Sequence, residues 1–154
     1  MITKKFIFII IFFAITNCGY QAIFSNQNDL DFSIKKIKLE GNKKIGRKII
    51  NLTSLKENNN KSYAYNLILS SEKKIEIVSK DKSKNASIYK TTIDVYFTLK
   101  DPNNQDAIIK TKEFTSSFSY NNMNNKFDLS QYQKNIELNL IDIISQEIII
   151  FLNS

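Results

Sequence analysis

The chain of 154 residues contains no histidine and only one cysteine, Cys18. Histidine is the usual general base near neutral pH, and the cysteine thiolate is a common nucleophile, so two frequent catalytic groups are missing or scarce. A zinc site built from cysteine and histidine ligands is excluded as well. We therefore expect a protein that is not an enzyme and that has no metal site and no cofactor.

The acidic side chains do not form an obvious catalytic pair. They are scattered through the middle of the chain without the paired spacing that general acid–base catalysis needs. They include Glu72, Glu76, Asp81, Asp94 and Asp101. A Ser–Lys dyad stays open as an arrangement, although both residue types are so common here that chance pairs are expected.

The single cysteine directly follows a short apolar run near the N-terminus. Lys4 and Lys5 precede ten apolar residues, Phe6 to Ile15, and Cys18 comes after Thr16 and Asn17. A positive segment, a short apolar run and a processing site form a secretory signal peptide. We predict that residues 1–17 are this signal and that Cys18, which resembles the cysteine of a lipobox, is lipidated with acyl chains. A lipobox normally has Gly, Ala or Ser where this chain has Asn17.

Two other interpretations of the same segment fit its sequence less well. An uncleaved transmembrane helix would need about 20 apolar residues, more than this run provides. A buried core helix followed by an inert thiol would be apolar all round, which is rare in small domains. A lone cysteine in an exported chain cannot form an internal disulfide, which fits its use as an anchor.

The size and charge of the mature chain limit its organisation and partners. Removal of 17 residues from 154 leaves 137, which corresponds to one domain. The remaining 20 basic and 15 acidic residues give a net charge of +5. Basic proteins often bind nucleic acid, but an exported protein meets none, so we expect no nucleic-acid partner. Anionic lipid head groups or a phosphorylated glycolipid suit the charge better.

The first part of the mature chain predicts a tether, a strand and a helix. Residues 18–31 lack a sustained period and form the acylated N-terminus and tether, whereas 32–154 form the domain. In residues 32–40 the alternation of apolar side chains shifts by one residue partway along, which indicates a β-bulge. Gly41-Asn42 is a turn signal. Residues 43–57 place apolar side chains on one helical face, ending at the Asn58-Asn59-Asn60 run. These side chains are Ile45, Ile49, Leu52 and Leu55.

Three strands and a long helix follow. The first strand runs from Tyr63 to about Ile77 as one long bent strand. In the second strand, Tyr89 to Leu99, apolar and polar side chains alternate strictly, which indicates a sheet with one covered face. Asp101-Pro102-Asn103-Asn104 is a turn before a strand at about 107–120. Ser130 with Gln133 fits a capping box for a final helix of about 20 residues, roughly 30 Å long. Its apolar side chains are Tyr132, Ile136, Leu140, Ile143 or Ile144, Ile148 and Phe151.

The predicted order is β-α-β-β-β-α. We expect an α+β fold in which two helices pack on one face of a mainly antiparallel four-stranded sheet. The other face would carry Lys90, Thr92, Asp94, Tyr96 and Thr98 of the second strand.

This layout resembles the LptE family of lipopolysaccharide-assembly outer-membrane lipoproteins. The resemblance rests on the Cys18-Gly19-Tyr20 start of the mature chain, the order of elements, the strand and turn in 86–101, and the strand 114–120 that leads through a polar loop into the last helix. It implies a lipid-anchored protein on the periplasmic side of the outer membrane. There it would plug an LptD-type β-barrel, help it assemble and bind lipopolysaccharide. Its acyl chains would lie in the inner leaflet, and Gly19 after Cys18 is compatible with this sorting.

Four lysines are candidates for lipopolysaccharide binding: Lys80, Lys82, Lys84 and Lys126. The first three cluster at the turn between the first two long strands, and the fourth lies in the loop before the last helix. Their ammonium groups would contact phosphates as point charges, although exposed lysines are often only solvated surface. The resemblance points to these loops in general. As an alternative, the polar sheet face would lie against the barrel wall.

Two other functions stay open. One is an auxiliary lipoprotein of another envelope transport pathway, which would have a different partner. The other is a carbohydrate- or peptidoglycan-active lipoprotein, which would need a carboxylate pair in a cleft.

Overall fold

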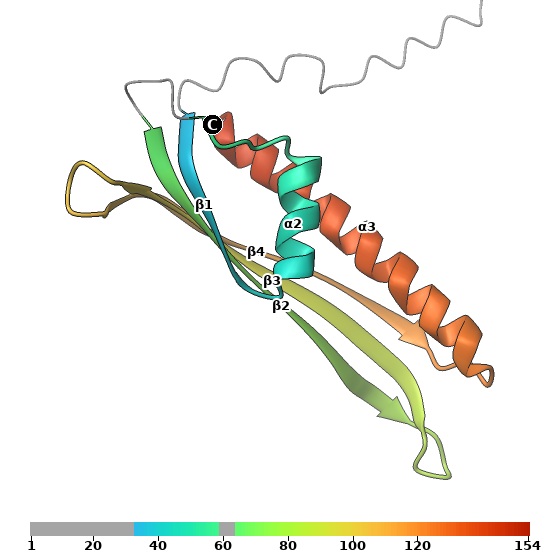
Figure 1. Ribbon diagram of the computed structural model, residues 1–154. Helices are drawn as coiled ribbons and strands as arrows, with labels where there is room; N and C mark the ends of the chain where they lie inside the picture. Colours follow the sequence, from blue (N-terminus) through green and yellow to red (C-terminus); the bar gives the residue numbers. More distant parts are fainter. Residues whose placement is uncertain (1–32, 59–63) are drawn as a thin grey trace, which may run out of the picture.

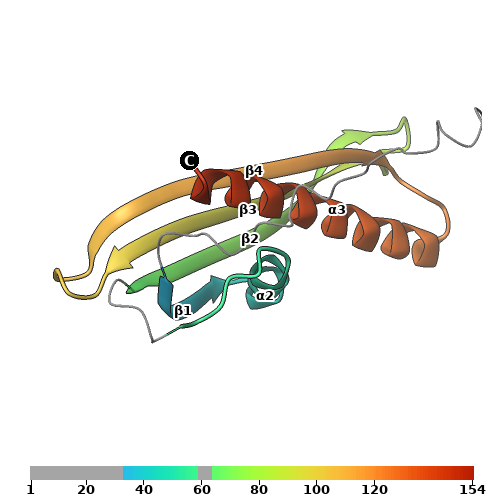
Figure 2. The ribbon, with the colours of Figure 1, turned by 90° about the horizontal axis from the view of Figure 1, so that it is seen from above.

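Two helices cover one face of a four-stranded sheet in the computed structural model, which describes residues 33–58 and 64–154 (Figure 1). The sheet order is β1-β2-β3-β4, and Figure 2 shows both helices on the same side of it. The predicted α+β architecture is confirmed. The signal peptide, Cys18 and the tether lie outside the described residues. The elements are β1 (Ser33–Gly41), α2 (Lys43–Leu52), β2 (Ala64–Lys80), β3 (Ala86–Asp101), β4 (Ala107–Asn121) and α3 (Lys126–Leu152).

The sheet is mixed, which refines the expectation of a mainly antiparallel one. β1 pairs with β2 in parallel, and β2, β3 and β4 pair in antiparallel order. Parallel neighbours need a crossover connection, and α2 lies in the segment that supplies it. The predicted bulge in β1 is confirmed by a register shift between Ile34 and Lys36.

The strict alternation in β3 correctly identifies the covered face. The odd-numbered side chains from Thr91 to Leu99 are buried, and the even-numbered ones point to the opposite face, which has no helix. The core lies between this row and the two helices. Its fully buried members include Ile45 and Ile49 of α2, Leu67 and Leu69 of β2, Phe114 of β4, and Ile144 and Ile148 of α3.

The first helix is shorter than predicted. α2 ends at Leu52 instead of continuing to residue 57, because the Thr53 hydroxyl donates back to the Ile49 carbonyl at 2.8 Å and Ser54 adopts a φ of 53°. Leu52 is consequently 47% exposed, whereas Leu55, beyond the helix, turns back into the core. Helical periodicity placed both on one face, but the chain leaves the helix between them.

The last helix begins earlier than predicted. It starts at Lys126, where the Asn125 side chain accepts a hydrogen bond of 2.9 Å from the Phe127 amide. The predicted capping box at Ser130 is therefore wrong, since Asn125 supplies the cap five residues earlier. The helix has 27 residues, not about 20, and of the two alternatives Ile143 and Ile144 it is Ile144 that is buried.

Gly41 joins β1 to α2 through a left-handed conformation. Its φ is +64°, and a Cβ atom there would overlap the carbonyl oxygen of Ser71. The next amide, that of Asn42, donates to the same oxygen at 2.7 Å. Asn42 also caps α2, because its side chain accepts from the Ile45 amide at 3.4 Å. The predicted turn at Gly41-Asn42 is confirmed.

Within the described part of the chain, no helix has the length and apolar character to cross a membrane.

Candidate functional site

The four predicted lysines lie at one end of the molecule. Lys80 ends β2, Lys82 and Lys84 lie in the turn to β3, and Lys126 begins α3. The β2–β3 turn and the β4–α3 loop lie at the same end in both views (Figure 1, Figure 2). All four residues are exposed, and none of them makes a salt bridge with another described residue.

Hydrogen bonds to backbone groups hold the two loops of this end in place. In the β2–β3 turn the Asp81 amide donates to the Asn85 carbonyl at 2.8 Å, and the Asp81 carboxylate accepts from the Asn85 amide at 2.9 Å. The side chain of Asn122, at the start of the β4–α3 loop, donates to the Ala86 carbonyl at 2.9 Å. The lysine-bearing loops are therefore tied to the same end of β3.

The open face of the sheet is broad and polar. Lys74 of β2 lies 3.5 Å from the Asp94 carboxylate of β3, which also accepts a 2.8 Å hydrogen bond from the Thr115 hydroxyl of β4. Thr98 and Thr111 share a hydrogen bond of 3.2 Å across β3 and β4. Tyr96 is the large aromatic side chain of this face and is 48% exposed. The face thus combines hydroxyls and charges of both signs.

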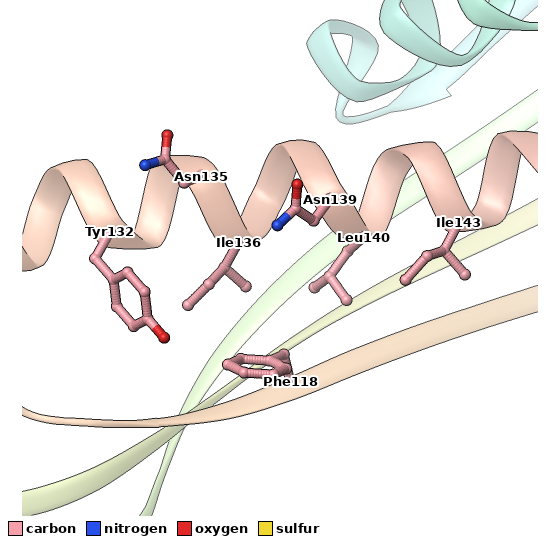
Figure 3. Close-up of a pocket in the computed structure, with 7 residues that line it drawn as sticks. All are labelled: Phe118, Tyr132, Asn135, Ile136, Asn139, Leu140 and Ile143. Atoms are coloured by element: carbon pink, nitrogen blue, oxygen red, sulfur yellow. The ribbon is translucent and has the colours of Figure 1, made fainter. Parts of the chain in front are cut away.

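A groove of about 270 Å³ lies between α3 and the edge strand β4 (Figure 3). Ile136 and Leu140 are buried, but Phe118, Tyr132 and Ile143 are 48%, 36% and 45% exposed. Helical periodicity places Tyr132 and Ile143 among the apolar positions of the last helix and gives no indication of a hollow beside them. The lining consists of Phe118, Tyr132, Asn135, Ile136, Asn139, Leu140 and Ile143.

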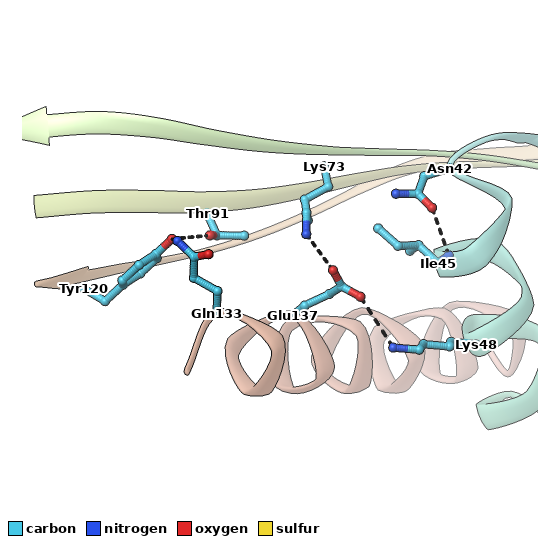
Figure 4. Close-up of polar contacts among 8 residues, drawn as sticks. All are labelled: Asn42, Ile45, Lys48, Lys73, Thr91, Tyr120, Gln133 and Glu137. Carbon is cyan, nitrogen blue, oxygen red and sulfur yellow. Dashed lines mark hydrogen bonds and ion pairs between the residues drawn. The ribbon is translucent and has the colours of Figure 1, made fainter. Parts of the chain in front are cut away.

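An ion-pair cluster links the two helices to the sheet (Figure 4). The Glu137 carboxylate of α3 lies 2.7 Å from the Lys73 ammonium of β2 and 3.4 Å from the Lys48 ammonium of α2. Burial alone would raise the pKa of Glu137, but the hydrogen bond from Lys73 and the charges of both lysines outweigh it and lower the pKa below its usual value. The sequence contains no signal for this pairing, because the three residues lie far apart in the chain.

A second polar cluster lies nearer the lysine end (Figure 4). The Tyr120 hydroxyl is 3.2 Å from the Thr91 hydroxyl and accepts a 2.9 Å hydrogen bond from the Gln133 side chain. These residues come from β3, β4 and α3, so the contact fixes the first turns of α3 on the sheet. Gln133 thus bonds across the core instead of capping its own helix.

Residues 33–58 and 64–154 contain no group of three or more His, Cys, Asp or Glu side chains arranged to hold a metal ion. The polar features that the structure does bring together are an exposed cationic end, a polar sheet face and two clusters inside the sandwich. The cationic end and the sheet face are surfaces that other molecules can contact, whereas the two clusters lie between the helices and the sheet.

The comparisons with known proteins concern the fold. By sequence, the chain matches no protein-family profile and no curated protein. By structure, it is similar to a protein of Caulobacter crescentus CB15 described as a predicted lipoprotein, with a TM-score of 0.54 and 15% identity, over 82% of this chain and 91% of that one. It is also similar to uncharacterized lipoprotein B of Nitrosomonas europaea, with a TM-score of 0.50 and 12% identity, over 79% and 84% of the two chains. The chain therefore shares its fold with proteins described as lipoproteins.

Proposed function

We propose that this chain is an outer-membrane lipoprotein of the LptE type. In this role it plugs an LptD-type β-barrel, helps the barrel assemble and binds lipopolysaccharide during its transport to the cell surface. It acts by binding and has no enzymatic activity. The fold shared with proteins described as lipoproteins supports a lipid-anchored envelope protein, as does the signal-like segment that ends at Cys18.

The open polar face of the sheet carries the proposal. The interior of a transmembrane β-barrel is polar, so a plug needs a surface that forms hydrogen bonds and ion pairs with the barrel wall. The Lys74–Asp94–Thr115 row spans three strands on the open face of the sheet. A surface of this kind fits a polar lumen better than the apolar core of an obligate dimer interface, which is depleted of charge.

Capture of the protein from outer membranes tests this role. A photoreactive phenylalanine analogue at Tyr96, on the open face, should form a covalent adduct with a β-barrel protein. The same analogue at Phe114, which is only 1% exposed, is the matched aromatic control and should give none. Capture of a different envelope protein at Tyr96 would favour the auxiliary role in another transport pathway. Depletion of the protein should also lower the amount of lipopolysaccharide at the cell surface.

A further inference from the structure

The groove between α3 and β4 exposes apolar surface that the fold itself does not cover. Phe118, Tyr132 and Ile143 face the hollow and stay between one third and one half exposed, while Ile136 and Leu140 form its buried side (Figure 3). No charged residue lines it, and the polar members are the amides Asn135 and Asn139. Binding of a ligand that removes exposed apolar area from water lowers the free energy of the complex. The groove therefore favours an apolar ligand.

The groove begins close to the lysine end. Lys126 precedes Tyr132 by six residues on the same helix, which corresponds to about 9 Å along its axis. From Tyr132 to Ile143 the groove follows α3 for roughly 16 Å. A cationic end followed by an uncharged apolar groove matches a molecule with an anionic head and an apolar tail. A peptide strand added to the β4 edge would make no use of the lysines.

We propose that this groove holds one acyl chain of an anionic glycolipid whose phosphates lie at the lysine end. The inference rests on the proposed function and assigns a place to one part of its ligand. The groove volume of about 270 Å³ is enough for one alkyl chain of moderate length. Nine methylene groups would fill it if each occupies about as much space as a water molecule, roughly 30 Å³.

Tryptophan fluorescence can test the groove directly, since the chain contains no tryptophan of its own. The protein would be the mature chain, residues 18–154, with Cys18→Ser to remove the anchor. Tyr132→Trp places the reporter in the groove, and Tyr96→Trp places a control on the open sheet face. Alkyl phosphates with a brominated chain end are the probes. We expect quenching in the Tyr132→Trp variant and none in the Tyr96→Trp variant.

The length of the alkyl chain should control affinity. From hexyl through octyl to decyl phosphate, binding should tighten by up to about fourfold per methylene group, because each added group is buried. Dodecyl and tetradecyl phosphate should add little once the groove is full. Affinity that does not depend on chain length, or quenching that is equal at both reporters, would overturn the proposal.

A matched pair of variants locates the site. Ile143→Gln changes a groove residue that is 45% exposed, and Leu138→Gln changes a residue of the same helix that is 41% exposed but does not line the groove. In the Tyr132→Trp background, Ile143→Gln should weaken decyl phosphate binding by about tenfold, and Leu138→Gln should leave it unchanged. Equal effects of the two changes would count against the groove.

Competition identifies the source of the chain. Lipopolysaccharide should displace decyl phosphate from the Tyr132→Trp variant at concentrations where phosphatidylglycerol vesicles do not. Equal displacement by the vesicles would overturn the assignment to a glycolipid. Failure of the acylated protein to bind the probe would overturn it as well, because the protein's own acyl anchor would then fill the groove. If decyl phosphate fails to quench the Tyr132→Trp variant but Tyr96 still forms an adduct with a barrel protein, the groove proposal fails and the proposed function stands. If quenching occurs but no barrel adduct forms, only the plug role is refuted.

Discussion

Lys73 of β2 donates a 2.7 Å hydrogen bond to the Glu137 carboxylate of α3, and Lys48 of α2 contacts the other oxygen of the same carboxylate at 3.4 Å. One acidic side chain thus joins the sheet to both helices that cover it. Breaking a partly buried ion pair leaves charged groups without their partner, which costs more than the loss of a surface pair.

Glu137→Gln should lower the free energy of unfolding by roughly 1–3 kcal/mol, between the values for surface and buried pairs. Glu147→Gln, on an exposed part of the same helix, is the control and should change it little. Urea denaturation at neutral pH measures both. Equal stability of the two variants would show that the cluster contributes nothing.

The pH dependence of this cluster has a defined sign. Because the pKa of Glu137 in the folded chain lies below 4.5, its value in an unfolded chain, the interaction stabilises the fold fully above that pH and is lost as the pH falls through the lowered folded pKa. The stability difference between the parent chain and Glu137→Gln should therefore shrink as the pH is lowered below about 4.5. A difference that stays constant down to pH 2 would contradict the lowered pKa.

The two faces of β3 should respond very differently to a new carboxylate. Val95 is fully buried under the helices, so Val95→Asp would bury an unpaired charge and should cost several kcal/mol. Thr98 lies on the open face, and Thr98→Asp should cost far less, although it removes the hydrogen bond to Thr111. Thermal unfolding of the two variants makes the comparison. Similar losses in both would mean that the face without helices is also packed.

Cys18→Ala should abolish acylation. The variant should not incorporate radioactive palmitate and should accumulate as an uncleaved or unanchored species, because the apolar run before it is too short to span a bilayer. Labelling of the parent protein in the same cells is the positive control. Incorporation of label into the variant would refute the assignment of Cys18 as the lipidation site.

The lysine end should contribute to lipopolysaccharide binding through the sum of small interactions. Changing Lys80, Lys82, Lys84 and Lys126 together to Gln should weaken binding by roughly 1–4 kcal/mol, at about 0.2–1 kcal/mol for each exposed charge pair. Binding to the parent protein should also weaken as salt rises. Affinity measured at low salt, with the fold and the barrel complex unchanged, is the readout.

A second set of four exposed lysines provides a control with the same loss of charge. These are Lys35 and Lys36 of β1 and Lys43 and Lys44 at the start of α2, away from the lysine end. Their replacement by Gln should leave lipopolysaccharide affinity close to that of the parent. Equal weakening by the two sets would indicate attraction by net charge alone, and no change in either would refute the role of the lysine end.

Local sequence pattern predicts which side chains of β3 and of the last helix face the core. Side chains alternate along a strand and recur every three to four residues on a helix, so the buried row of β3 and the positions Ile136, Leu140 and Ile148 of α3 follow from local pattern. The turn at Gly41-Asn42 follows from the residue types that such turns need. The bulge in β1 was likewise visible as a slip in phase.

How these elements meet depends on contacts between segments that are distant in the sequence. The parallel pairing of β1 with β2 depends on where α2 returns the chain, and the exposure of Phe118 depends on how α3 passes over the edge of the sheet. The Glu137 cluster joins residues that are 64 and 89 positions apart. Sequence periodicity gives the direction of a side chain relative to its own backbone. Whether that side chain is buried, lines a groove or forms an ion pair depends on which other segment of the chain packs against it.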